Sequence, residues 1–120
     1  MRERLKPLLG VRGEFTGKVK RFGTIIGLKS IKTVILSNIK YSGKVVTGHL
    51  WFTVEENIAS AQLAVGDCVS FVGTVAEYMK VYNGDDWDNW AKYIKYPYET
   101  DYCIKYLDNV KKISEDEYNA

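Results

Sequence analysis

The fold is decided by residues 63–78, which read LAVGDCVSFVGTVAEY. The Gly66-Asp67 pair within it indicates a turn, and the alternation that follows this pair predicts a long strand. Val69, Phe71 and Val75 share one face of this strand, so we expect that face to line a core. Gly73 falls on the same face, where a glycine indicates a bend or a bulge.

A second long strand is predicted upstream, over residues 13–27 (GEFTGKVKRFGTIIG). Its several glycines suit a strand that bends sharply, as at the corner of a barrel. Strict alternation divides its side chains between two faces. One face takes Phe15, Gly17, Val19 and Arg21, and the other takes Thr16, Lys18, Lys20 and Phe22.

Two further strands are predicted at residues 33–41 (TVILSNIKY) and 44–52 (KVVTGHLWF). The Ser-Gly pair between them is typical of a tight hairpin. His49 and Trp51 alternate onto one face, opposite Leu50 and Phe52. We expect both His49 and Trp51 to pack rather than to stack on a ligand, since a Trp near the centre of a strand usually fills a core or a corner.

A short helix is predicted after these strands. Thr53 and Glu56 have the spacing of a capping box, in which each side chain satisfies a backbone N–H of the other residue. Ile58 begins a short apolar stripe, and Gly66 is a natural stop. The helix therefore spans about two turns.

The rest of the chain divides into a loop, a strand and two terminal segments. Residues 83–100 carry three Asp and five aromatic side chains, and we expect a long loop there. Residues 101–113 resume as a strand. Residues 1–9 form an N-terminal arm, and the acidic tail 114–120 is expected to fray.

The order of these elements is strand, strand, strand, short helix, strand, long loop, strand. This order predicts a mainly β fold, a five-stranded OB-fold Greek-key barrel with one short helix between strands three and four. The domain spans residues 10–113, and a chain of 120 residues has room for one such core.

The amino-acid sequences of three segments strengthen this interpretation. Residues 63–78 resemble the entry to the fourth strand of OB domains. Residues 34–52 together with 100–113 resemble small OB proteins of Gram-positive phages and mobile elements. The resemblance implies the fold and a role in nucleic-acid binding, but it carries no catalytic signature.

Charge is strongly divided along the chain. Up to Phe52 there are eleven Lys and Arg against two acids, a formal charge of +9. From Thr53 onward there are six Lys and Arg against thirteen acids, a formal charge of −7. Clustered cations neutralise phosphates and release their counterions, so the basic half suggests a polyanionic partner. A merely solvated basic surface is the alternative.

OB-folds bind single strands on strands two and three and the adjoining loops, through cations that contact phosphates and aromatic rings that stack on bases. Both residue types occur in the corresponding segments here. The candidate nucleic-acid-binding residues are Lys18, Lys20, Arg21, Phe22, Lys29, Lys32, Lys40, Tyr41, Lys44, Trp87, Trp90 and Tyr93. The loop aromatics have two alternatives, contact with a protein or packing onto the barrel.

Other kinds of chemistry find little support. A phosphate-binding Gly-rich loop, a nucleophile–His set and zinc-ligand spacing are all missing from the sequence, so we expect no enzyme, metal or cofactor. Cys68 and Cys103 are expected to remain reduced. The N-terminus does not resemble a signal peptide, and no apolar run approaches the ~20 residues that cross a bilayer. We therefore expect a cytoplasmic protein that does not bind membranes.

Two functions follow from the sequence. The first is binding of single-stranded DNA or RNA, in the DNA metabolism of a phage or mobile element. The alternative is a protein-interaction module or inhibitor on the same fold, which docks a host or phage protein through the acidic aromatic loop. A continuous basic stripe favours the first, and basic residues scattered around the barrel favour the second.

Overall fold

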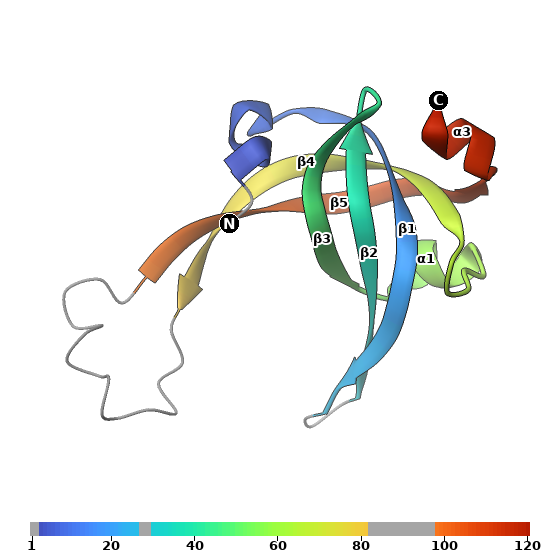
Figure 1. Cartoon of the computed structure of the whole chain (residues 1–120). Helices are drawn as coiled ribbons and strands as arrows, with labels where there is room; N and C mark the ends of the chain where they lie inside the picture. Colours follow the sequence, from blue (N-terminus) through green and yellow to red (C-terminus); the bar gives the residue numbers. More distant parts are fainter. Residues whose placement is uncertain (1–2, 27–29, 82–97) are drawn as a thin grey trace.

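Five antiparallel strands form one sheet in the computed structural model, which describes residues 3–26, 30–81 and 98–120 (Figure 1). A 3₁₀ helix precedes the sheet, a short helix follows the third strand, and another ends the chain. The elements are η1 (Glu3–Leu8), β1 (Arg12–Ile25), β2 (Ile31–Tyr41), β3 (Lys44–Thr53), α1 (Glu56–Ser60), β4 (Cys68–Val81), β5 (Tyr98–Ile113) and α3 (Glu115–Asn119).

The strand order is β3-β2-β1-β4-β5, and the sheet is not closed into a barrel. The expected closed barrel is therefore wrong: no ladder joins β3 to β5 in the described part of the chain. Helix α1 contacts β5 instead, where the Asn57 side-chain amide donates to the Leu107 carbonyl oxygen. A cavity lies in this seam, lined by Trp51 and Phe52 from β3 and by Ile104 from β5.

The core lies against the inner face of the sheet, as the alternation predicts. Phe71 is 1% exposed, and its ring centroid lies 5.9 Å from Phe15 and 5.8 Å from Phe52. Val69 and Val75 are also buried, which confirms the expected inner face of β4. Close contact of three aromatic rings adds specific geometry to the burial of apolar surface.

A bulge changes the facing of residues along β1. The register against β2 shifts between Val19 and Arg21, so Lys20 is an extra residue. Beyond it Arg21 faces outward, whereas the sequence alternation placed it with Phe15 and Val19. Phe22 pairs with fully buried Val34 and lies on the opposite side from Arg21.

The turn between β2 and β3 is the predicted two-residue hairpin. Ser42 has φ 51° and Gly43 has φ 78°. A type I′ turn needs positive φ at both central residues, and it matches the twist of the flanking strands. This prediction is confirmed.

The expected capping box of α1 is wrong. The helix begins at Glu56, and its N-cap residue is Glu55, which makes no side-chain capping bond. Thr53 is the last residue of β3, so it is held by the sheet and does not cap a helix. Ile58 is buried, as the apolar stripe predicts.

Both terminal segments pack against the sheet. Leu5 of η1 is fully buried in the core. The tail expected to fray forms α3, and its Tyr118 is only 5% exposed.

No helix in the described ranges is long and apolar enough to cross a bilayer. On the β4–β5 ladder Cys68 faces Ile113 and Cys103 faces Ala76, so about 26 Å of strand separates the two cysteines.

Candidate nucleic-acid interface

The surface of interest is the outer face, the side of β1, β2 and β3 that points away from the core. Cross-strand pairing arranges its side chains in rows across the three strands. Arg21, Ile35 and Trp51 form one row. Lys18 and His49, with Ser37 between them, form the next row. Neighbouring strands lie about 4.8 Å apart and rows about 6.6 Å apart, so a cation and an aromatic ring face solvent within about 10 Å of each other.

Trp51 lies on this face and is 54% exposed. The expectation that it packs is wrong, because its neighbours Leu50 and Phe52 take the inward positions and leave the indole on the solvent side. The alternation of His49 and Trp51 with those two residues was the signal that could have identified it. An exposed ring on a sheet surface is a platform on which a base can stack.

Five of the predicted cations on β1, β2 and β3 are either exposed or half-buried. Arg21 and Lys20 are exposed, Arg21 in its row and Lys20 at the bulge. Lys18 and Lys40 are half-buried. Lys44 is exposed beside the β2–β3 turn.

Three predicted site residues lie elsewhere. Tyr41 is on the inner side, with its ring centroid 5.1 Å from that of Phe15. Phe22 and Lys32 line a hollow beside Val54, on the side of the sheet opposite Arg21. The bulge in β1 accounts for Phe22, since one added residue reverses the facing of all that follow.

Four predicted site residues lie outside the described residues, and so does most of the expected loop 83–100. They are Lys29, Trp87, Trp90 and Tyr93.

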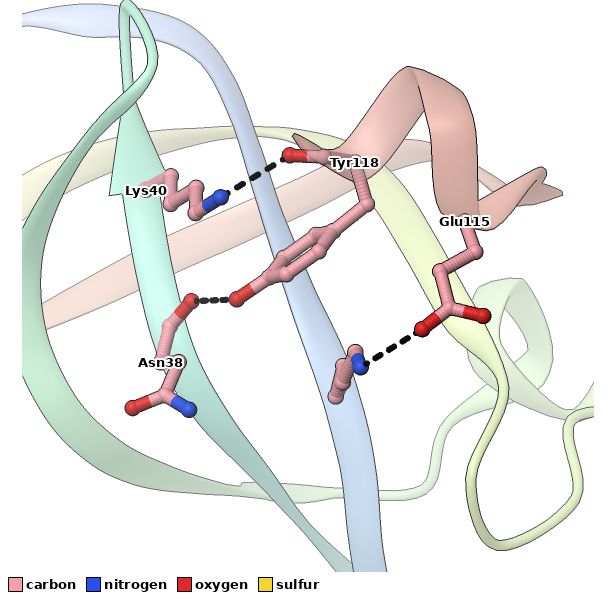
Figure 2. Close-up of polar contacts among 5 residues, drawn as sticks. Asn38, Lys40, Glu115 and Tyr118 are labelled. Atoms are coloured by element: carbon pink, nitrogen blue, oxygen red, sulfur yellow. Dashed lines mark hydrogen bonds and ion pairs between the residues drawn. The ribbon is translucent and has the colours of Figure 1, made fainter. Parts of the chain in front are cut away.

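The half-burial of Lys18 and Lys40 has a specific cause, which is α3. The Nζ of Lys40 donates to the Tyr118 carbonyl oxygen at 3.0 Å, and the Nζ of Lys18 lies 3.5 Å from Glu115 Oε1. The Tyr118 hydroxyl donates to the carbonyl oxygen of Asn38 on β2 (Figure 2). Sequence reasoning missed Tyr118 because a single aromatic in a short acidic tail has no periodic pattern.

The environment of Tyr118 also affects its ionisation. Burial raises the pKa of its phenol above the ordinary value, and the nearby Cys68 thiol, when ionised, adds to the rise. The phenol therefore stays protonated and can act as a donor to Asn38 through the neutral pH range.

The described residues also limit other kinds of site. Within them no three His, Cys, Asp or Glu side chains come together in a way that could hold a metal ion. The outer face offers cations, hydroxyls and rings, which suit binding of an anionic, base-bearing polymer.

Comparison with known proteins gives no match, whether to a family model, a curated protein or a solved structure. The function is therefore inferred from the geometry and chemistry of the outer face.

Proposed function

We propose that the chain is an OB-like protein that binds single-stranded nucleic acid on the outer face of β1, β2 and β3. Three features support the OB-like interpretation: the central place of β1, which pairs with both β2 and β4; the β4–β5 pairing; and the helix after β3. The open seam between β3 and β5 distinguishes this sheet from a closed OB barrel.

The observation that carries the proposal is the row Arg21–Ile35–Trp51. It sets a guanidinium and an exposed indole on one surface, with an aliphatic side chain between them. Arg21 contacts a phosphate, together with exposed Lys20. Trp51 stacks on a base, and His49 in the adjacent row provides a second ring. Such binding tolerates many sequences, since every base has a face on which a ring can stack.

Fluorescence anisotropy with labelled oligonucleotides at two salt concentrations tests the proposal. Single-stranded DNA or RNA should bind more tightly than duplex, and the affinity should fall as salt rises. Each neutralised phosphate of a single strand contributes about −0.7 to the slope of log K against log salt. If neither DNA nor RNA oligonucleotides bind at low salt, the proposal is refuted.

A second candidate, a protein-interaction module, draws support from the β1–β2 hairpin. This hairpin projects beyond the rest of the sheet (Figure 1). Its outer part exposes three isoleucines: Ile25, Ile26 (88% exposed) and Ile31. Adjacent exposed apolar side chains often mark a contact with another protein. The acidic aromatic loop 83–100, which the sequence suggests as the docking segment for this candidate, lies almost wholly outside the described residues.

The two candidates can be separated with Ile26→Ser. This change leaves the Arg21–Ile35–Trp51 row intact, so oligonucleotide affinity should be unchanged if the outer face is the site. A protein captured by the wild-type chain and lost with Ile26→Ser, in the absence of oligonucleotide binding, would favour the interaction module.

A further inference from the structure

The C-terminal clasp, residues 114–120, lies on the outer face of β1 and β2. Its anchor is Tyr118, whose ring lies under two cations: the Nζ of Lys40 is 4.1 Å from the ring centroid and that of Lys18 is 5.4 Å away. Figure 2 shows the Tyr118 side chain reaching from α3 towards Asn38 on β2. Asn38 lies on β2 at a second shift in the β1–β2 register, between Thr16 and Lys18, and its φ is 48°. This local irregularity of β2 presents the Asn38 carbonyl oxygen to the phenol.

The charge of the clasp is opposite to that of the face it covers. Its helix opens with Glu115, Asp116 and Glu117. Glu115 pairs with Lys18, and these side chains are 71% and 35% exposed. Acidic side chains in the first turn of a helix are also stabilised by the helix dipole, so their number alone is not evidence of a specific contact with the outer face. The specific observation is the ion pair in which Glu115 Oε1 lies 3.5 Å from the Nζ of Lys18.

The clasp is held by few contacts. A five-residue helix is too short to be stable without packing, and Tyr118 is its only buried side chain. The Glu115 side chain of the Lys18–Glu115 pair is mostly exposed to solvent, so this ion pair adds little to stability. A ligand that offers phosphates to Lys18 and Lys40 can therefore replace the carboxylate and the ring.

We propose that the C-terminal clasp regulates the nucleic-acid face by occupying two of its cations until a single strand displaces it. This inference rests on the proposed function. Arg21, Lys20 and Trp51 form the open part of the site, and Lys18 and Lys40 form the covered part. The strand first binds the open part and gains the covered part only when Tyr118 leaves its seat.

The salt dependence follows from this exchange. In the wild-type chain, the lysines of the covered part give up a carboxylate and a ring rather than small counterions. With the clasp detached, these two cations carry counterions that a strand releases. Two more contacts should steepen the slope of log K against log salt by about 1.4 and tighten binding roughly tenfold or more at low salt.

Full-length variants test the proposal against labelled single-stranded oligonucleotides. Tyr118→Ala should detach the clasp and give both effects. Glu115→Gln should tighten binding less, since Tyr118 remains seated. Asp116→Asn is the matched control: it removes the same charge from the same helix, but the described structure shows no contact of its side chain with the outer face. Equal gains from Glu115→Gln and Asp116→Asn would show a diffuse charge effect and overturn the proposal.

A second measurement reports displacement directly and needs only the wild-type chain, even if Tyr118→Ala does not fold. Amide resonances of residues 114–120 should move to sharp, random-coil positions when an oligonucleotide is added. If the oligonucleotide binds and these resonances stay in place, the clasp proposal fails while the proposed function stands. If no oligonucleotide binds to any variant, both fail.

Discussion

The Nζ of Lys40 lies 4.1 Å from the centroid of the Tyr118 ring, and the same nitrogen donates a hydrogen bond to the Tyr118 backbone. One residue of the tail thus meets a single β2 lysine through both its ring and its carbonyl oxygen. The phenol contributes separately, through its bond to Asn38. Tyr118→Phe removes only this last contact, because it keeps the ring and the backbone.

We expect Tyr118→Phe to lower the free energy of unfolding by about 1 kcal/mol at pH 7, the usual contribution of one hydrogen bond. The difference from wild type should shrink as the pH rises through and beyond 10. The folded-state pKa of Tyr118 lies above its ordinary 10.0, so its contribution is fully present below that value and is lost as the pH rises through the folded pKa. Phe does not titrate.

Urea unfolding of both chains at pH 8 and pH 11 measures this. A gap between wild type and Tyr118→Phe that stays constant over this range would contradict the prediction.

Phe71→Ala should destabilise the protein far more than Phe22→Ala. Phe71 is 1% exposed between two other rings, and emptying such a site costs about 3–5 kcal/mol. Phe22 is 45% exposed on the hairpin and should cost about 1 kcal/mol or less. Urea midpoints decide between them, and equal midpoints would mean that the facing of β1 and β4 is misassigned.

Gly73→Val should lower stability by about 1–3 kcal/mol, the usual cost of overpacking a core. A Cβ at this position would overlap Ile104 and crowd Leu107 on β5. Gly48→Val is the matched control, because a Cβ at this strand glycine meets nothing within 4 Å. Thermal melts of the two variants should differ clearly, and a similar loss in both would refute close approach at Gly73.

Trp51→Ala should weaken oligonucleotide binding by about 1–3 kcal/mol and leave the salt slope unchanged, since stacking releases no counterions. Phe22→Ala is the control, because it removes a comparably exposed ring from the opposite side of the sheet. Anisotropy titrations give both quantities. If Phe22→Ala weakens binding as much as Trp51→Ala, the outer face is not the site.

Arg21→Gln should weaken binding to all sequences alike and flatten the salt slope by about 0.7, the contribution of one phosphate contact. Lys32→Gln removes a cation from the other side of the same hairpin and should leave the slope nearly unchanged. The same titrations apply. A larger effect from Lys32→Gln would move the site to the hollow beside Val54.

Most of the strands were predictable because their signals are local. Alternation identified the inner face of β4, with Val69, Phe71 and Val75. Turn chemistry identified the hairpin at Ser42 and Gly43, since only a few residue types accept positive φ. The candidate cations on β1 were likewise predictable, because they form a local cluster of Lys and Arg in the sequence.

The tertiary structure decided which of those side chains share a surface. The bulge at Lys20 turned Arg21 outward and placed Phe22 on the opposite side of the sheet. A pattern of strict alternation does not reveal such an added residue. Exposure of Trp51 depended on which face of β3 the core covers, since Leu50 and Phe52 take the inward positions and leave the indole on the solvent side. The seating of Tyr118 on Lys18 and Lys40 joins positions 78 or more residues apart, a contact that no local pattern encodes. By itself the sequence determined strands, turns and charge; long-range pairing determined the face that the charges occupy and the segment that covers it.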